Sequence, residues 1–459
     1  MLRTLLFRIL LMFSVSPLLL AQGNPNATNC TNSSKMMCII PNVFGPFGLT
    51  LPNPTHNAHF DSDFQANFSP LGSAIGTALT LLPIASPASG FTYSFDQSTG
   101  VYARTAQSFG PVLAERAETI GKGKFYVALT YQYFSFDSLN GIELDQIHSV
   151  FKHLPPATGT PETFQTDFIT TTNSINLFVS QMTGFVTVGL SNRLDLSLAV
   201  PVNNVNLGVR SNAAIHRTFV DPTQSQPHYF DPSDPVSSTT HTFTNAGHAT
   251  GIWDITARLK GTLVRGAHAS LALATDLRFP SGDERNFLGS GTFGVKPFLI
   301  ASVSGKWAPH VNIGYQINGK SLLAGDLVGY NGTDQPNRPL KGHLPNDLFY
   351  TVGIDTGATK RLTLSFDLLG QHVFSAKEVV LAPSFTSAVP EIVTPNVVKQ
   401  NSYPQIAIVT GSFNVVTGSA GFKALLGGNL LLTANLLFQL NNDGLRTRVV
   451  PLVGLSYSF

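Results

Sequence analysis

From residue 123 onward, apolar and polar residues alternate along long segments, and short and long connections join these segments in turn. Alternation with a period of two is typical of an extended strand with two different faces. We predict twelve strands, at 123–136, 173–190, 193–210, 251–264, 269–281, 292–305, 309–320, 346–358, 361–374, 411–425, 429–441 and 446–459. Tight connections are expected at Ser191–Asn192, Gly266–His268, Lys306–Ala308, Gly357–Lys360 and Gly427–Gly428. Longer polar connections are expected at 137–172, 211–250, 282–291, 321–345 and 375–410, with a short one at Asp443-Gly444.

The order of the connections indicates the architecture. Short turns at one rim and long loops at the other are typical of a transmembrane barrel, and its closed sheet leaves no unpaired edge in lipid. The sequence therefore predicts an all-β fold, a transmembrane antiparallel β-barrel of about twelve strands over residues 123–459. A soluble sandwich with its apolar face turned inward is the alternative.

The two faces of each strand differ in polarity. In 309–320, Val311, Ile313 and Tyr315 alternate with polar residues, and we assign the apolar face to lipid because a charge in hydrocarbon is costly. Six aromatic residues are expected to point outward near the rims: Tyr131, Tyr133, Tyr315, Tyr350, Tyr457 and Phe459. The charged residues expected to line the lumen are Asp254, Arg258, Asp276, Arg278, Lys296, Asp367, Arg446 and Arg448. Because both signs are present, a strongly ion-selective filter is not expected.

The register of two hairpins also follows from the face assignment, because polar residues of paired strands must lie on the same face. A three-residue turn at Gly266–His268 would pair Arg265 with Ala269, Arg258 with Asp276 and Thr256 with Arg278. This register places opposite charges across the ladder, which favours it over a slip of two residues. A type I′ turn at Asp443-Gly444 would pair Asn442 with Leu445 and Gln439 with Arg448.

The N-terminal residues are typical of an exported chain. Arg3 and Arg8 precede a short apolar run that contains Pro17, and small residues follow, so residues 1–23 are predicted to be a cleaved signal peptide rather than a membrane anchor. Export makes a Cys30–Cys38 disulfide plausible, with two free thiols as the alternative. The formal net charge of +2 gives no reason to expect nucleic acid as a partner.

Residues 24–122 precede the first predicted strand and are expected to form a plug or a periplasmic segment that starts on the periplasmic side. Within them, Leu71–Gly90 is apolar and interrupted by Pro83 and Pro87, and we interpret it as a short helix or packed loop. An occupied lumen would make permeation gated and slow, whereas an unoccupied one would leave a polar pore.

Several short motifs resemble binding or catalytic sites but are better explained as structural or loop residues. Gly289–Gly294 spells G-x-G-x-x-G, but a loop precedes it and a strand follows, so no dinucleotide site is expected. His56, His59, Asp61 and Asp63 are metal-ligand types, but a polar, flexible N-terminal segment explains them better, and no metal site or cofactor is predicted. No spacing singles out His148, His153, His310 or His343 as catalytic, and the chain is predicted not to be an enzyme.

The chain ends in a strand with Tyr457 and Phe459 on one face, which resembles the terminal signature that the outer-membrane assembly machinery of bacteria reads. Phe125–Tyr133 is expected to pair with Leu452–Phe459 and so close the barrel, with a bulge or local gap at Pro451. Ser108–Leu144 and Thr275–Asp283 resemble a bacterial outer-membrane family named for meta-pathway phenol degradation, akin to fatty-acid and aromatic-hydrocarbon channels. The resemblance covers most of residues 108–459.

This resemblance implies a barrel in the bacterial outer membrane that takes up small hydrophobic or aromatic molecules passively. Its expected partners are outer-membrane lipid, the assembly machinery and a small hydrophobic substrate, without nucleic acid. Two alternatives are a structural or surface-binding barrel with a filled lumen and an outer-membrane barrel enzyme.

Overall fold

The computed structural model describes residues 30, 34–45, 48–56, 60, 62–86, 93–96, 101–104, 108–153, 163–219, 226–266, 268–326, 340–394 and 397–459. The predicted signal peptide, residues 1–23, lies outside these ranges. Among the described residues, no helix is both long enough and apolar enough to cross a membrane.

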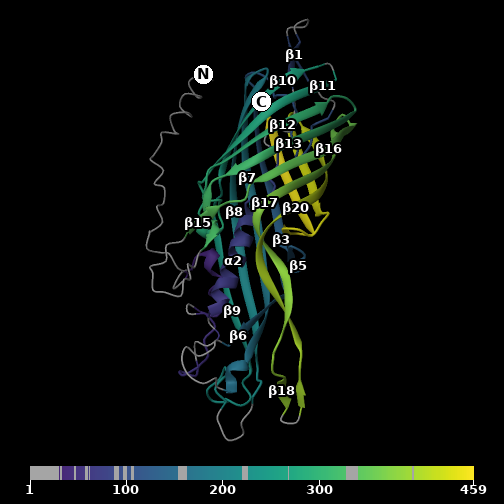
Figure 1. The fold of residues 1–459 in the computed structure, drawn as a ribbon. Coiled ribbons are helices and arrows are strands. Elements are labelled where there is room, and N and C mark those ends of the chain that lie inside the picture. Colours follow the sequence, from purple (N-terminus) through teal and green to yellow (C-terminus); the bar gives the residue numbers. More distant parts are fainter. Residues whose placement is uncertain are drawn as a thin grey trace.

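Twelve antiparallel strands form a closed barrel, as predicted (Figure 1). In ring order they are β3 (Phe125–Phe136), β7 (Phe168–Ser191), β8 (Leu194–His216), β10 (Ile255–Arg265), β11 (Ala269–Phe279), β12 (Gly294–Val303), β13 (Trp307–Asn318), β16 (Asp347–Thr359), β17 (Leu362–Thr386), β20 (Ser402–Gly427), β21 (Leu430–Gln439) and β23 (Val449–Ser458). The short turns all lie at one rim, which we call the short-turn end; the opposite rim is the long-connection end.

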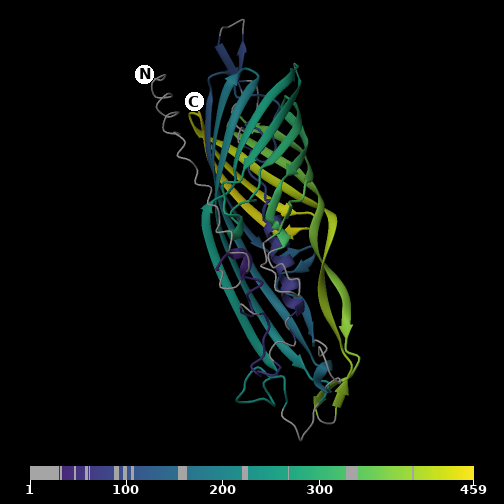
Figure 2. The same ribbon diagram turned by 60° about the vertical axis from the view of Figure 1, so that its left-hand side comes forward.

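Four strands extend far beyond the barrel at the long-connection end (Figure 2). The extensions of β7 and β8 join β6 (Ile147–Lys152) and β9 (Thr240–Ile252) in a sheet that we call the wall. The extensions of β17 and β20 form an arm, with β18 (Glu391–Thr394) and β19 (Val397–Lys399) at its tip. The arm meets the wall where Glu391 bonds His216 at 2.8 Å. The sequence prediction made these four strands too short; apolar side chains of the extensions, such as Ile169, Ile215 and Val379, are buried against the N-terminal region and do not form the lipid-facing pattern on which the prediction relied.

The register of β10 and β11 is as predicted: Arg258 faces Asp276 and Thr256 faces Arg278. The predicted pairing at the turn is wrong, since Arg265 faces Ser270 rather than Ala269. A bulge between Thr262 and Val264 takes up the extra residue, so the predicted register holds in the rest of the hairpin.

The last hairpin has the predicted register, with Phe438 opposite Val449, but not the predicted turn. Gly444 has a φ of 72°, whereas Asp443 is not left-handed, so the turn is not type I′. β22 (Leu445–Arg446) pairs instead with β4 (Ser138–Leu139), which itself pairs with β5 (Ile142–Glu143). Competition from this neighbouring loop, which the local sequence does not reveal, opens the turn.

The first and last strands pair as predicted and close the barrel, from Leu452 opposite Gln132 to Ser458 opposite Tyr126. Pro451 causes no bulge, because its pairing with Leu436 of β21 is regular. The N–H of Phe459 donates to the carbonyl of Phe125, and such bonds recur at every second residue, so an N–H at position 451 would point at Tyr133. The ladder to β3 stops at Leu452, and the predicted gap therefore lies on the β3 side alone.

The outer face of the barrel is apolar and the inner face polar, which confirms the face assignment. Val311, Ile313 and Ile317 are exposed, whereas His310 and Asn312 are buried inside. Of the six aromatic residues expected outside, five are exposed, and Tyr350 lies over Gly370 on the same outer face.

The N-terminal region begins, in the part that the structure describes, at the long-connection end and not on the short-turn side as expected. Cys30 and Cys38 form a disulfide beside η1 (Met36–Cys38), and Asn245 of the wall donates to the carbonyl of Ile39 at 2.9 Å. The helix α2 (Ser62–Leu79) then runs between the wall and the arm, and it includes the first part of the predicted 71–90 helix (Figure 1). The remaining elements are β1 (Tyr93–Asp96), β2 (Val101–Arg104), η2 (Thr163–Thr166), η3 (Glu284–Asn286), β14 (Lys320–Asp326) and β15 (Leu340–His343). Gly289–Gly294 leads from a loop after η3 into β12, as predicted.

Candidate functional site

Residues 108–122, which we call the plug loop, fill the lumen at the short-turn end. Ser108 and Thr119 lie near the short turns, while Glu115 reaches the middle of the barrel, so the loop enters the lumen, reverses and leaves by the same end. Gly110 and Gly121, with φ of 76° and 97°, provide backbone conformations that other residues rarely adopt.

The plug loop has no regular secondary structure, so the barrel wall supplies its hydrogen bonds. Asn312 accepts from the N–H of Glu115 at 2.7 Å and donates to its carbonyl at 3.0 Å. Ser302 accepts from the N–H of Ala117 at 3.1 Å, and Thr262 donates to the carbonyl of Ala117 at 2.6 Å. The polar inner face is thus satisfied largely by protein in this half of the barrel.

Glu115 is the central charge of this contact. Its carboxylate accepts from Arg258 at 2.5 Å and Lys260 at 3.2 Å, and also from Ser86 at 2.6 Å. Burial alone would raise the pKa of the Glu115 carboxyl, but Lys260 and Arg258 outweigh burial and hold that pKa below its ordinary value. Glu115 is therefore ionised at neutral pH, and it ties the plug loop to β10.

A second ion cluster holds the loop nearer the short-turn end. Arg116 contacts Asp355 at 2.6 Å, and His310 lies between Asp355 at 3.4 Å and Asp367 at 2.7 Å. Ser108 also donates to Asp355. Asp367, predicted to line the lumen, thus lies inside the barrel but is buried in this cluster beneath the plug loop.

A cavity of about 260 Å³, the lumen cavity, lies between the plug loop and the residues that follow α2. One side of it is apolar, with Leu82, Ile84, Phe134, Phe136 and Phe185. The lining also includes Asp347 and six of the eight predicted lumen residues: Asp254, Arg258, Asp276, Arg278, Lys296 and Arg446. Arg446 lies apart from the other five, on β22, which pairs with β4 close to the end of β3.

Arg448 does not line the lumen cavity, and its prediction was wrong. Its side chain is 72% exposed and lies 4.0 Å from Glu143. Parity fails here because Arg448 lies in the break between β22 and β23, where its N–H donates to Asp137.

The charges of the cavity are mostly paired with one another. Asp276 contacts Arg258 at 2.6 Å and Lys296 at 3.4 Å, and Asp254 contacts Arg278 at 3.6 Å. Among the lining cations that the structure describes, Arg446 is the one without a carboxylate within 4 Å. Its guanidinium donates to the carbonyl of Val416 at 2.7 Å and to Thr417 at 3.2 Å. An anionic group entering the cavity would therefore meet Arg446 without displacing an internal ion pair.

A second cavity of about 10 Å³ lies between Ser86, Val112 and the strands β3, β21 and β23, beside the closing seam of the barrel. This volume is about that of one water molecule.

The four histidines considered as catalytic candidates are not brought together. His310 is enclosed by Asp355 and Asp367, His148 contacts Thr172 at 3.3 Å, and His343 is exposed on β15. His153 lies at the long-connection end, where the wall meets the N-terminal segment.

Sequence reasoning missed Glu115 and the plug loop, although it expected a plug within 24–122. The available signal was "VLAERAET", in which three charged residues are set among small apolar ones ahead of the first strand. Such a segment has no surface to bury its charges against except the polar inner face of the barrel.

No protein-family model matches the chain, and no curated protein matches it in sequence. Its structure is similar to that of the COG4313 outer membrane channel from Pseudomonas putida F1, with 11% identity and a TM-score of 0.39 over 75% of this chain and 99% of that chain. It is also similar to a Pseudomonas aeruginosa FadL homologue (10% identity, TM-score 0.31, 81% of this chain and 96% of that chain). A deltaS2 mutant of the TodX monoaromatic hydrocarbon channel gives 9% identity and a TM-score of 0.32 over 81% of this chain and 96% of that chain. The phenol-degradation resemblance stays a prediction, and the function proposed below rests on the residues of this chain.

Proposed function

We propose that this protein is a bacterial outer-membrane channel for the passive uptake of small hydrophobic or aromatic molecules, with the plug loop as its gate. The observation that carries the proposal is a closed barrel whose lumen cavity has an apolar side and a charged side above a loop that fills the exit. A membrane location is supported by the apolar outer face and its aromatic residues.

The lining residues indicate the ligand chemistry. An apolar or aromatic body would pack on Phe134, Phe136 and Phe185, and a carboxylate or phenolic oxygen would face Arg446. The cavity is smaller than the ~300–1,000 Å³ usual for drug-sized ligands, which favours molecules with a single ring or a short chain. Large hydrophilic solutes would be rejected by the plug loop.

The chain provides its own probe of binding. It has two tryptophans: Trp253 lines the lumen cavity, and Trp307 is exposed on the outer face. In the Trp307→Phe variant, titration with benzoate is expected to change the fluorescence of Trp253 saturably. Arg446→Gln should weaken binding about tenfold, as expected for the loss of one charge-assisted hydrogen bond. The exposed Arg448→Gln serves as the matched control.

Transport is tested separately with proteoliposomes. Benzoate should enter proteoliposomes faster than it enters liposomes without protein. Sucrose should enter both at the same rate. Benzoate binding without transport would favour the second candidate, a structural barrel with a filled lumen, which the dense bonding of the plug loop supports. We propose no catalytic activity, no nucleic-acid partner, and assembly through the terminal strand.

A further inference from the structure

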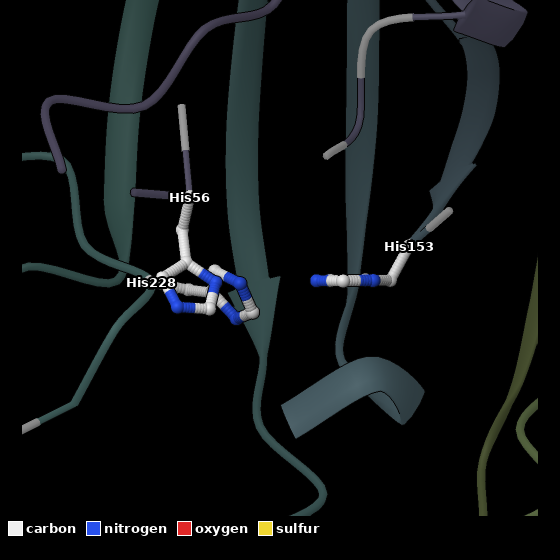
Figure 3. A group of neighbouring side chains, drawn as sticks. All are labelled: His56, His153 and His228. Carbon is white, nitrogen blue, oxygen red and sulfur yellow. The ribbon is translucent and has the colours of Figure 1, made fainter. Parts of the chain in front are cut away.

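Three histidines from distant parts of the chain meet at the long-connection end of the wall (Figure 3). His56 belongs to the N-terminal segment, His153 follows β6 directly, and His228 lies in the connection between β8 and β9. Each offers a ring nitrogen, and the three nitrogens all lie within 4.8 Å of one another. The site is separate from the lumen cavity, since none of its residues lines that cavity.

The innermost histidine is oriented by a carboxylate. Asp167 lies 2.8 Å from Nδ1 of His228, and the same carboxylate accepts from the N–H of Thr218 at 2.8 Å and from its hydroxyl at 3.1 Å. Because Nδ1 is used in this way, His228 presents Nε2 to the other two rings. A carboxylate on the far nitrogen is the usual arrangement around a metal-binding imidazole, where it fixes the tautomer and makes the ring a stronger ligand.

The surroundings hold the three rings in a largely dry environment. His228 and Phe60 are buried, and the ring of Phe60 contacts both His153 and His228, with centroids 5.2 and 5.0 Å apart. Asn53 donates to the carbonyl of Pro227 at 2.8 Å, which links the segment of His56 to the loop of His228. His56 and His153 are only half-buried, so a solute ion can approach from their side.

Local charge is compatible with a cation. Arg217 is nearby and donates to the carbonyl of His228 at 2.9 Å. The carboxylate of Asp167 opposes this positive charge, and Asp234 acts on Arg217 from the other side. Packing of aromatic rings alone would explain the contacts between the rings. It would not require Asp167 on Nδ1 of His228, the ring whose Nε2 faces the cluster.

We propose that His56, His153 and His228 form a binding site for a divalent transition-metal ion of the zinc class, with Asp167 as the orienting carboxylate. Three imidazoles leave a fourth tetrahedral position for water or an exogenous ligand. Zn–N distances of about 2.1 Å place the nitrogens roughly 3.4 Å apart, so the rings need to close by at most about 1.4 Å on binding. The ion would clamp the N-terminal segment to the wall. No metal site was predicted from the sequence, because these ligands are separated by about 75–100 residues.

The test uses full-length protein without a polyhistidine tag, stripped with a chelator and then titrated with Zn²⁺ against a chromophoric competitor. One zinc ion per chain is expected. His56→Ala and His153→Ala should each weaken binding at least tenfold, and Asp167→Asn by about 10–100-fold. His148→Ala, in strand β6, which leads directly to His153, is outside the cluster; it is the matched control and should leave the affinity unchanged.

Folding of each variant is checked by the heat-dependent mobility of the barrel in gel electrophoresis. Co²⁺ is a second probe, because visible absorption bands report four-coordinate nitrogen ligation and should be lost in His153→Ala. The proposal is overturned if folded protein binds no stoichiometric zinc. It is equally overturned if the His56 and His153 variants bind zinc as tightly as His148→Ala does.

Discussion

At the scale of single residues, Glu115 decides how firmly the plug loop is held. It is buried between Arg258 and Lys260, and both cations also have a carboxylate on the barrel wall, Asp276 and Asp195. Without Glu115, the charges of these barrel residues would therefore still be nearly balanced, whereas the plug loop would lose its main ionic contact.

Replacing Glu115 with Gln is expected to loosen the plug loop while the barrel stays closed. Removal of one partner from a buried ion pair costs about 3 kcal/mol, most of it borne here by the loop. Single-channel recordings should show more frequent and larger openings than in the parent protein. Glu143→Gln, at an exposed carboxylate, is the control, and equal conductance in the two variants would contradict the role given to Glu115.

Protonation of Glu115 at low pH should have the same effect as the Glu115→Gln substitution. Because the pKa of Glu115 is depressed, its contribution is complete above the ordinary value of 4.5 and is lost as pH falls through the lower pKa of the folded protein. The part of the conductance that depends on Glu115 is therefore expected to rise as pH falls below about 4.5. In Glu115→Gln this rise should be much smaller, and an identical acid response in both proteins would assign it to other groups.

Gly189 tests how closely the loop approaches the barrel. A Cβ there would lie 1.8 Å from the carbonyl oxygen of Gly121, whereas nothing lies within 4 Å of the corresponding position at Gly184 on the same strand. Gly189→Ala should destabilise the protein by about 1–3 kcal/mol, and Gly184→Ala should be close to neutral. Urea unfolding in detergent micelles measures both, and similar midpoints would mean that the close contact is not formed.

At the scale of elements, the barrel strands were predictable and the segments around them were less so. Each of the twelve strands has a lipid-type face, and its alternation with polar residues is visible in the sequence. The bulge after Thr262 and the opened turn at Asp443 were not predictable, because each depends on a neighbour outside its own hairpin. Six charged cavity residues followed from parity alone, whereas Arg448 failed where the strand is interrupted.

The plug loop is expected to be dispensable for folding and necessary for closure. Its irregular backbone contributes no strand to the ring, so replacing residues 111–118 with a Gly-Ser linker should leave the β3–β23 seam intact. Conductance should then rise at least several-fold, because the cavity would open to the short-turn end. Linker replacement of the exposed residues 397–401 near the arm tip is the control. An unchanged conductance in a folded plug variant would show that other residues block the lumen.

At the scale of the whole molecule, the barrel closes where its first and last strands meet, and the ladder of this seam is shortened by a proline. The N–H absent at Pro451 falls on the β3 side, where the seam stops at Leu452. Pro451→Val should add one backbone hydrogen bond to Tyr133 and stabilise the barrel by about 0.5–1.5 kcal/mol. Thermal unfolding of the purified protein measures this effect. A loss of stability would indicate that proline fits the local backbone better than a ladder residue does.

The path of the N-terminal region has a consequence for biogenesis. Asn53 bonds Pro227 at one end of the molecule, Ser86 lies beside Val112 in the lumen, and Ser108 reaches Asp355 at the other end. The chain therefore passes through a ring that its own last strand closes. Either that ring forms around a chain already in place, or some 60 residues must be drawn through a finished pore. The first order of events is far simpler, so closure of the β3–β23 seam would enclose a segment that precedes the barrel strands in the sequence.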